Sequence, residues 1–113
     1  MIGQPLIGVG VGVPVKILKH DAKVYRVISV PKSAVPEPIL RVKEVVMAIG
    51  VPQLNTTITI EARVWVEKRR FVYFITRKPY SDYLTRLAEQ GVREVLLYQI
   101  VPSYQSTTRG GRA

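Results

Sequence analysis

The sequence predicts a single α+β domain in which a four-stranded antiparallel sheet carries two helices on one face. Three observations support this fold class. Segments rich in β-branched residues end at proline, as strands do. Two other segments place apolar residues at helical spacing. The segments follow one another in the order β-α-β-β-α-β, and right-handed crossover connections fold that order into one sheet.

The length and composition fit one folded domain. At 113 residues the chain can bury a core. We expect an extended arm over 1–14, a packed domain over 15–102 and a flexible basic tail over 103–113. Glycine and proline interrupt the apolar start, which therefore does not fit a membrane span or a secretory leader. The absence of cysteine excludes disulfides and thiolate metal sites. We therefore expect a soluble, cytoplasmic protein.

The first half of the domain begins with a strand pair. Residues 15–18 are expected to pair with 24–30 across a turn, and Pro31 ends the second strand. Residues 39–49 then place apolar side chains at helical spacing, with glycine and proline directly after them. This pattern predicts a helix. Because the segment is rich in valine, which lowers helix propensity, a strand over 39–49 is the alternative.

The second half of the domain supplies the other elements. Residues 56–66 alternate between apolar and polar side chains, which predicts a strand. A tight connection leads into an aromatic strand, and Pro79 opens a helix that Gly91 closes. Residues 92–101 form the last strand. This order is that of the ferredoxin-like arrangement, in which the helices cover one sheet face and leave the other free.

The aromatic strand is the most informative stretch of the chain. Residues 67–78 interleave five cations with three aromatic residues. Because side chains alternate along a strand, Phe71 and Tyr73 share one face, and Phe74 takes the other. Trp65 and Arg63 fall on the polar side of the neighbouring strand. Rings flanked by cations suit the stacking of bases and the neutralisation of phosphates. In the alternative interpretation, Phe71 and Tyr73 belong to the core and the cations form a solvated edge.

The net charge favours a polyanionic partner. Seventeen Lys and Arg against eight Asp and Glu give a formal charge of +9, which attracts nucleic acid, anionic membranes or acidic proteins. Nucleic acid is the first expectation, with cations on phosphates and rings on bases. The residues expected to contact it are Arg63, Trp65, Lys68, Arg69, Arg70, Phe71, Tyr73, Arg77, Lys78, Lys16, Lys19, Arg109 and Arg112.

Enzymatic interpretations have little support in the sequence. His20 is the only histidine and lies beside Asp21 in an expected turn, and no cluster of possible ligands has the spacing of a metal site. The carboxylates are scattered singly, without an acid/base pair or an activated nucleophile. We therefore expect a non-catalytic protein without a metal or a cofactor.

Two short stretches resemble known nucleic-acid-binding families. The run Arg-Arg-Phe-Val-Tyr-Phe-Ile at 69–75 resembles the first ribonucleoprotein signature of the RNA-recognition motif family. That resemblance implies base stacking by Phe71 and Tyr73. Residues 77–95 combine Arg-Lys-Pro, a helix and Gln-Gly-Val-Arg-Glu-Val, and are similar to the opening strand-helix-strand of archaeal Alba proteins. That similarity implies contacts of Arg77 and Lys78 with DNA or RNA.

The whole outline resembles small ribosomal proteins with a ferredoxin-like core and basic extensions. This resemblance implies a structural component of a ribonucleoprotein that contacts rRNA and neighbouring proteins. Asn55 is the only asparagine, and valine and charged residues are abundant, a composition typical of thermophiles. The resemblance to small ribosomal proteins implies a ribonucleoprotein such as an archaeal ribosome. The alternatives are an Alba-like chromatin protein that binds duplex DNA, and a protein-interaction subunit that docks through its free sheet face.

Overall fold

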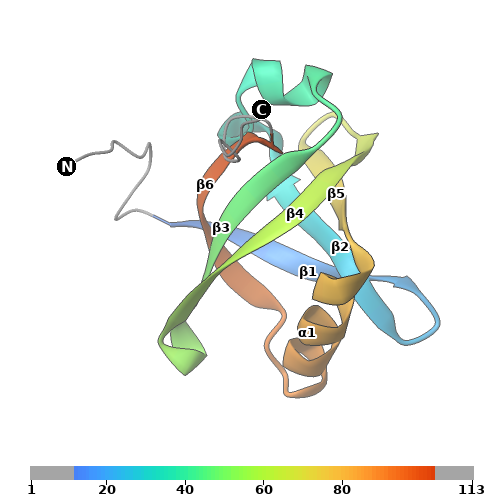
Figure 1. The fold of residues 1–113 in the computed structure, drawn as a ribbon, viewed down its shortest axis with the longest axis vertical. Helices are drawn as coiled ribbons and strands as arrows, with labels where there is room; N and C mark the ends of the chain where they lie inside the picture. The colour runs from blue at the N-terminus through green and yellow to red at the C-terminus, as the bar shows by residue number, and fades with distance from the viewer. Residues whose placement is uncertain (1–11, 104–113) are drawn as a thin grey trace, which may run out of the picture.

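In a computed structural model, which describes residues 12–103, the chain forms a closed antiparallel β-barrel (Figure 1). Around the barrel the strands follow the order β1-β2-β5-β4-β3-β6. The strands are β1 (Val13–Asp21), β2 (Val24–Pro31), β3 (Val45–Val51), β4 (Thr56–Glu67), β5 (Phe71–Thr76) and β6 (Glu94–Pro102). The helical elements are α1 (Lys78–Glu89) and the short 3₁₀ helices η1 (Lys32–Ala34), η2 (Glu37–Arg41) and η3 (Pro52–Leu54).

The predicted ferredoxin-like α+β fold is wrong. The sheet has six strands and is closed, and α1 is the one α-helix among residues 12–102. The error lies in residues 39–49, where η2 is followed by the strand β3 and not by a helix. Val45, Met47 and Ile49 are buried at every second position, which is the period of a strand. The strand alternative is therefore confirmed for the part of this segment from Val45 onward.

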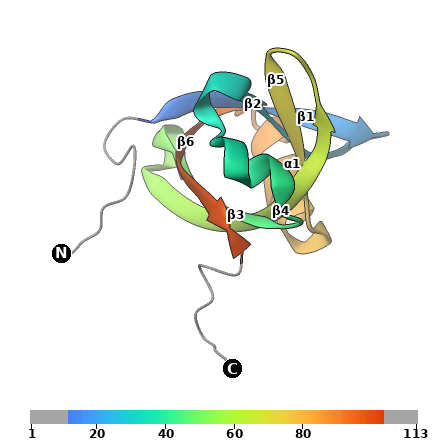
Figure 2. The same cartoon turned by 90° about the horizontal axis from the view of Figure 1, so that it is seen from above.

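β3 closes the barrel because both of its edges are paired. It pairs antiparallel with β4 on one side and with β6 on the other. β6 also pairs with β1, and β1 pairs with β2. Figure 2 looks into the resulting ring, with η1 and η2 lying across one end. An open sheet with one free face is thereby replaced by a barrel with an inner and an outer surface.

The core fills the inside of the barrel. Side chains that alternate along the strands are fully buried there, among them Ile28, Val72, Phe74, Met47 and Ile60. α1 packs against β2 (Figure 1), and its buried residues Leu84, Leu87 and Ala88 belong to the same hydrophobic cluster as the barrel interior. The backbone amide of Tyr25 in β2 donates to Thr85 Oγ1 of α1 at 3.0 Å. Tyr25 is buried and belongs to the same cluster.

Several local predictions are confirmed. β1 and β2 form the expected hairpin, with Leu18 opposite Val27. β4, β5, α1 and β6 lie where strands and a helix were predicted.

Asn55 adopts a left-handed conformation with φ of 52° at the end of η3, where asparagine is tolerated better than most residues.

The ends of the chain are described only in part. Of the predicted arm, Val13 and Pro14 belong to β1. Residues 1–11 and 104–113, which include Arg109 and Arg112, lie outside the described residues. Among residues 12–103, no helix has the length and apolar character needed to cross a membrane.

Candidate nucleic-acid interface

The outer surface of the β4–β5 hairpin carries exposed aromatic side chains. Val72 and Phe74 of β5 point into the barrel and are fully buried, whereas Phe71 is 41% exposed and Tyr73 is half-buried. Trp65 of β4 is 47% exposed. Most large apolar side chains of this domain are buried, so two exposed rings on neighbouring strands mark this surface as unusual.

A β-bulge lies at Trp65. Val64 is opposite Phe74, but Val66 is opposite Tyr73, so Trp65 is the extra residue in β4. Bulges bend a strand and redirect side chains. The indole of Trp65 meets the imidazole of His20 edge to face, with ring centroids 5.3 Å apart. His20, which was expected in a solvated turn, therefore supports the exposed Trp65 ring on one side.

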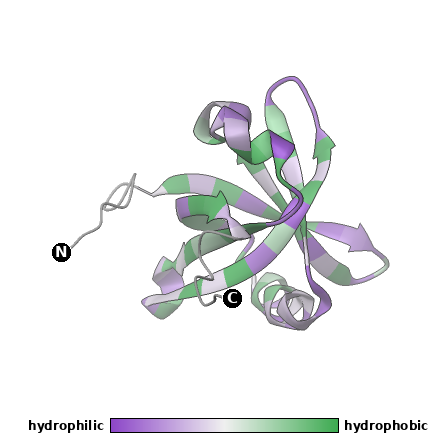
Figure 3. Cartoon of the chain, turned by 45° about the horizontal axis from the view of Figure 1, so that its top comes forward, coloured by the Kyte–Doolittle hydropathy of each residue, from purple (hydrophilic) through white to green (hydrophobic). Residues whose placement is uncertain are grey.

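Three adjacent cations occupy the turn between β4 and β5. Lys68, Arg69 and Arg70 are exposed, and no ion pair involves them within residues 12–103. The turn is fixed by backbone bonds from Lys68 N to the Phe71 carbonyl and from Lys32 N to the Arg70 carbonyl, both 2.8 Å long. Figure 3 shows this turn as a hydrophilic loop. The cations thus stand at the end of the surface that carries the rings.

A second group of cations surrounds a polar pocket of about 270 Å³ where β5 leads into α1. Arg26 of β2 donates to the Thr76 carbonyl, from Nη2 at 2.8 Å and from Nε at 3.2 Å. Arg77 Nε lies 3.6 Å from Glu61 Oε1. The residues that line the pocket are Arg26, Glu44, Ala62, Arg63, Ile75, Thr76, Arg77 and Lys78.

The beginning of α1 adds partial positive charge to this pocket. The N-cap is Arg77, no side chain caps the helix, and no acidic residue lies in the first turn. The N-terminal end of a helix favours anions over cations. Here, however, two cationic residues, Arg77 and Lys78, occupy that end. Thr76 also lines the pocket, and its hydroxyl is buried without a hydrogen-bond partner in the part of the chain that is described. These features fit an anion such as phosphate.

Pairing across the strands places Lys16 on the same outer surface as the rings. Lys16 is opposite Ser29, and Ser29 is opposite Tyr73. Lys19 lies elsewhere: its Nζ is 5.8 Å from the centre of the Tyr25 ring, and Arg93 covers the same ring at 5.3 Å. The structure therefore groups most of the proposed contact residues on β4, β5 and the start of α1, with Lys16 nearby and Lys19 apart.

Sequence reasoning did not include Arg26, Thr76 and His20 in the interface. Arg26 gave one signal, a charged residue inside the apolar strand from 23 to 30. Thr76 and His20 join the interface through contacts between distant parts of the chain, with Arg26 and with Trp65. No group of three or more possible metal ligands is present within residues 12–103.

The chain matches no protein family model, no curated protein and no solved structure. The geometry of this surface is therefore what supports a function.

Proposed function

We propose that the protein binds structured RNA by charge and shape, without catalysis, as a cytoplasmic component of a ribonucleoprotein such as an archaeal ribosome. The main support is the exposure of Trp65 and Phe71 on the same outer surface, next to the exposed cations of the β4–β5 turn. An exposed ring lacks the stabilisation that burial would give, about 25 cal/mol for each Å² of apolar surface removed from water. Stacking on a base recovers about 1–3 kcal/mol.

The pocket at the start of α1 supports the same function. It is lined by four cationic residues, Arg26, Arg63, Arg77 and Lys78, and by the carboxylate of Glu44, and Glu61 lies 3.6 Å from Arg77. The cations outnumber these two carboxylates, so a phosphate there would be compensated. Arg63 and Trp65 lie two residues apart along β4, about 6–7 Å by the rise of a strand. One strand of nucleic acid is long enough to place a phosphate in the pocket and a base on Trp65.

The test is the affinity of the full chain for three labelled oligonucleotides at several salt concentrations. An RNA hairpin, an unpaired RNA and a DNA duplex are compared by fluorescence anisotropy. We expect the RNA hairpin to bind most tightly, with log K falling against log salt by about 0.7–0.9 per neutralised phosphate. Co-sedimentation of the native protein with ribosomal particles is expected in the same salt range.

Two outcomes would contradict the proposal. Tighter binding to the DNA duplex would favour a chromatin protein. Absence of binding to all three, or an affinity independent of salt, would favour a protein partner on the β4–β5 surface, where exposed aromatic residues are common binding hot spots.

A further inference from the structure

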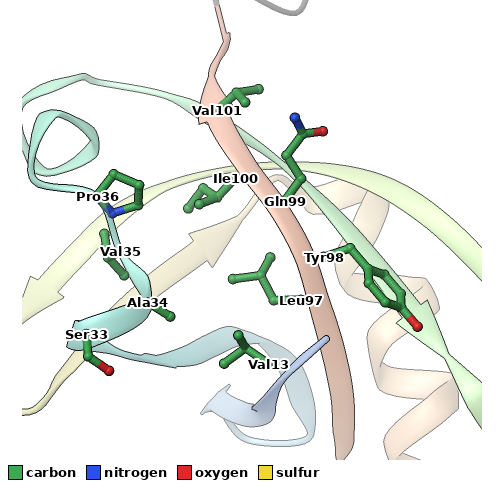
Figure 4. A pocket seen from close by; sticks show the side chains of 10 residues that line it. All are labelled: Val13, Ser33, Ala34, Val35, Pro36, Leu97, Tyr98, Gln99, Ile100 and Val101. Carbon is green, nitrogen blue, oxygen red and sulfur yellow. The ribbon is translucent and has the colours of Figure 1, made fainter. Parts of the chain in front are cut away.

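Two pockets of the barrel differ in what they offer a ligand. The pocket beside β6, of about 380 Å³, is lined by apolar side chains such as Leu97, Ile100 and Val101 (Figure 4), and its described lining residues include no charged one. The pocket where β5 leads into α1, of about 270 Å³, has five charged residues among the eight that line it. We call it the cationic pocket. An anionic ligand is expected there and not beside β6, because an unpaired charge is costly in an apolar site.

The inner wall of the cationic pocket is built by neighbouring strands of the barrel. Ala62 of β4 is opposite Thr76 of β5, and Arg26 of β2 donates to the carbonyl of Thr76. Ala62 and Thr76 are 3% and 1% exposed. The next residue on the same face of β5 is Phe74, which is fully buried in the core. The pocket therefore ends at the core on this side, and a ligand has to enter it from outside the barrel.

The hydroxyl of Thr76 is a buried donor that needs a partner. Its Oγ1 has no hydrogen-bond partner within residues 12–103, although most buried polar atoms of proteins are paired. Because Thr76 and Ala62 are opposite each other, their side chains lie on the same face of the sheet, and both residues line the cationic pocket. A hydroxyl donates to a phosphate oxygen. A phosphate at the bottom of the pocket therefore supplies the missing partner.

Further donors around the pocket are available to the same ligand. A guanidinium has five N–H donors, and the Thr76 carbonyl accepts from Nη2 and Nε of Arg26. The other N–H groups of Arg26 have no partner in the part of the chain that is described. The start of α1 adds partial positive charge, since its first turn contains no acidic residue. A phosphate in the pocket thus meets both neutral and charged donors.

The charge of the pocket distinguishes two kinds of phosphate. A phosphodiester inside a nucleic acid strand carries one negative charge. A terminal phosphate monoester carries about 1.5–2 negative charges at pH 7 and presents three acceptor oxygens. The four cationic residues that line the pocket exceed the nearby carboxylates, those of Glu44 and Glu61, by two. This excess matches the charge of a monoester.

We propose that the cationic pocket binds the terminal phosphate of an RNA strand, so that the protein recognises an end of its RNA. This proposal rests on the proposed function and specifies which part of the RNA the surface binds. An internal phosphodiester continues as a chain in two directions, whereas a terminal phosphate fits a pocket that the core closes on one side. Arg63 lines the pocket, and Trp65 follows two residues later in β4. The base of the terminal nucleotide therefore stacks on the exposed indole.

The test compares RNA hairpins that differ only in their ends. Each hairpin is labelled in its loop, has one unpaired nucleotide at either end, and carries a 5′-phosphate, a 3′-phosphate or hydroxyl groups alone. Fluorescence anisotropy with the full chain should show that one phosphorylated form binds about tenfold or more tightly than the hydroxyl form, because hydrogen bonds to charged groups are strong. The preferred form identifies which end of the strand lies in the pocket. Inorganic phosphate should shift the NMR signals of Thr76 and compete with that form.

Replacement of Thr76 by valine separates binding from folding. Valine keeps the shape of the side chain and removes a buried hydroxyl that lacks a partner, so the free energy of unfolding should not fall. The variant should nevertheless lose most of the preference for the phosphorylated end. Thr76→Ser keeps the hydroxyl and should keep the preference. Thr59→Val makes the same substitution at an exposed position of β4 and should leave the binding of all three hairpins unchanged.

The outcomes separate this proposal from the function on which it rests. Equal affinity for the three hairpins, or an equal gain for both phosphorylated ends, would overturn the terminal-phosphate site and leave RNA binding intact. A loss of stability in Thr76→Val would also overturn it, since the hydroxyl would then have a partner in the free protein. Phosphate-induced shifts at Thr76 without binding of any hairpin would support a phosphate monoester site and contradict the RNA function. The hairpin comparison uses the unaltered chain, so it holds even if a variant fails to fold.

Discussion

The guanidinium of Arg26 holds the backbone carbonyl of Thr76 with two hydrogen bonds, 2.8 Å from Nη2 and 3.2 Å from Nε. Arg26 belongs to β2, and Thr76 is the last residue of β5. α1 begins two residues later, at Lys78. This pair therefore fixes the place where the barrel leads into the helix, and it forms part of the wall of the cationic pocket.

Replacement of Arg26 by methionine should affect both stability and anion binding. Methionine keeps the apolar stem and removes the donors, so we expect the free energy of unfolding to fall by about 1.5–3 kcal/mol, the range for hydrogen bonds to a charged group. Titration with inorganic phosphate, followed by the NMR shifts of Arg77 and Lys78, should show weaker binding. Arg93→Met removes a cation that lies over Tyr25, and should leave those shifts as in the wild type.

Replacement of Trp65 by alanine should weaken RNA binding more than it lowers stability. The ring is 47% exposed, so little core packing is lost, whereas one stacked base is worth about 1–3 kcal/mol, or roughly 5- to 150-fold in affinity. Anisotropy with the RNA hairpin measures the loss, and urea unfolding provides the stability. Trp65→Phe keeps a stacking surface and should restore most of the affinity. Equal affinity for Trp65→Ala and the wild type would remove Trp65 from the interface.

The double replacement of Arg69 and Arg70 by alanine should reduce the salt dependence of RNA binding. If each side chain neutralises one phosphate, the slope of log K against log salt should become shallower by about 1.4–1.8. The matched control is Arg41→Ala with Lys43→Ala. It removes the same charge from residues that are exposed and lie outside the β4–β5 hairpin. A slope that changes equally in both double variants would indicate a general charge effect and not a contact surface.

The sequence predicted individual strands better than their arrangement. In β4 and β5, the alternation of side chains predicted the strands and which residues share a face, but it left open whether Phe71 and Tyr73 face the core. In residues 39–49 two periods overlap, because Ile39, Val42 and Val46 continue a helical series while Val45, Met47 and Ile49 form a strand series. The valine content favoured the strand, and pairing on both edges stabilises it.

The closure of the barrel depends on contacts that no local pattern reveals. β3 pairs with β6, although about fifty residues separate the paired positions Met47 and Ile100. The interface likewise combines features that a local pattern predicts with contacts between distant residues. Phe71 and the neighbouring arginines follow from alternation within one strand, whereas the contact of Arg26 with Thr76 spans a sequence separation of 50. The pocket could therefore not be assembled from the sequence alone.

The two phenylalanines of β5 provide a test of the barrel itself. Phe74 is fully buried in the core, and Phe71 is 41% exposed on the outer surface. We expect Phe74→Ala to lower the free energy of unfolding by about 3–5 kcal/mol, because it removes core contacts and leaves a cavity. Phe71→Ala should cost less than about 1 kcal/mol, since its ring already contacts water. Urea unfolding of both variants gives the comparison, and the reverse order of effects would place Phe71 inside the barrel and its ring out of reach of RNA.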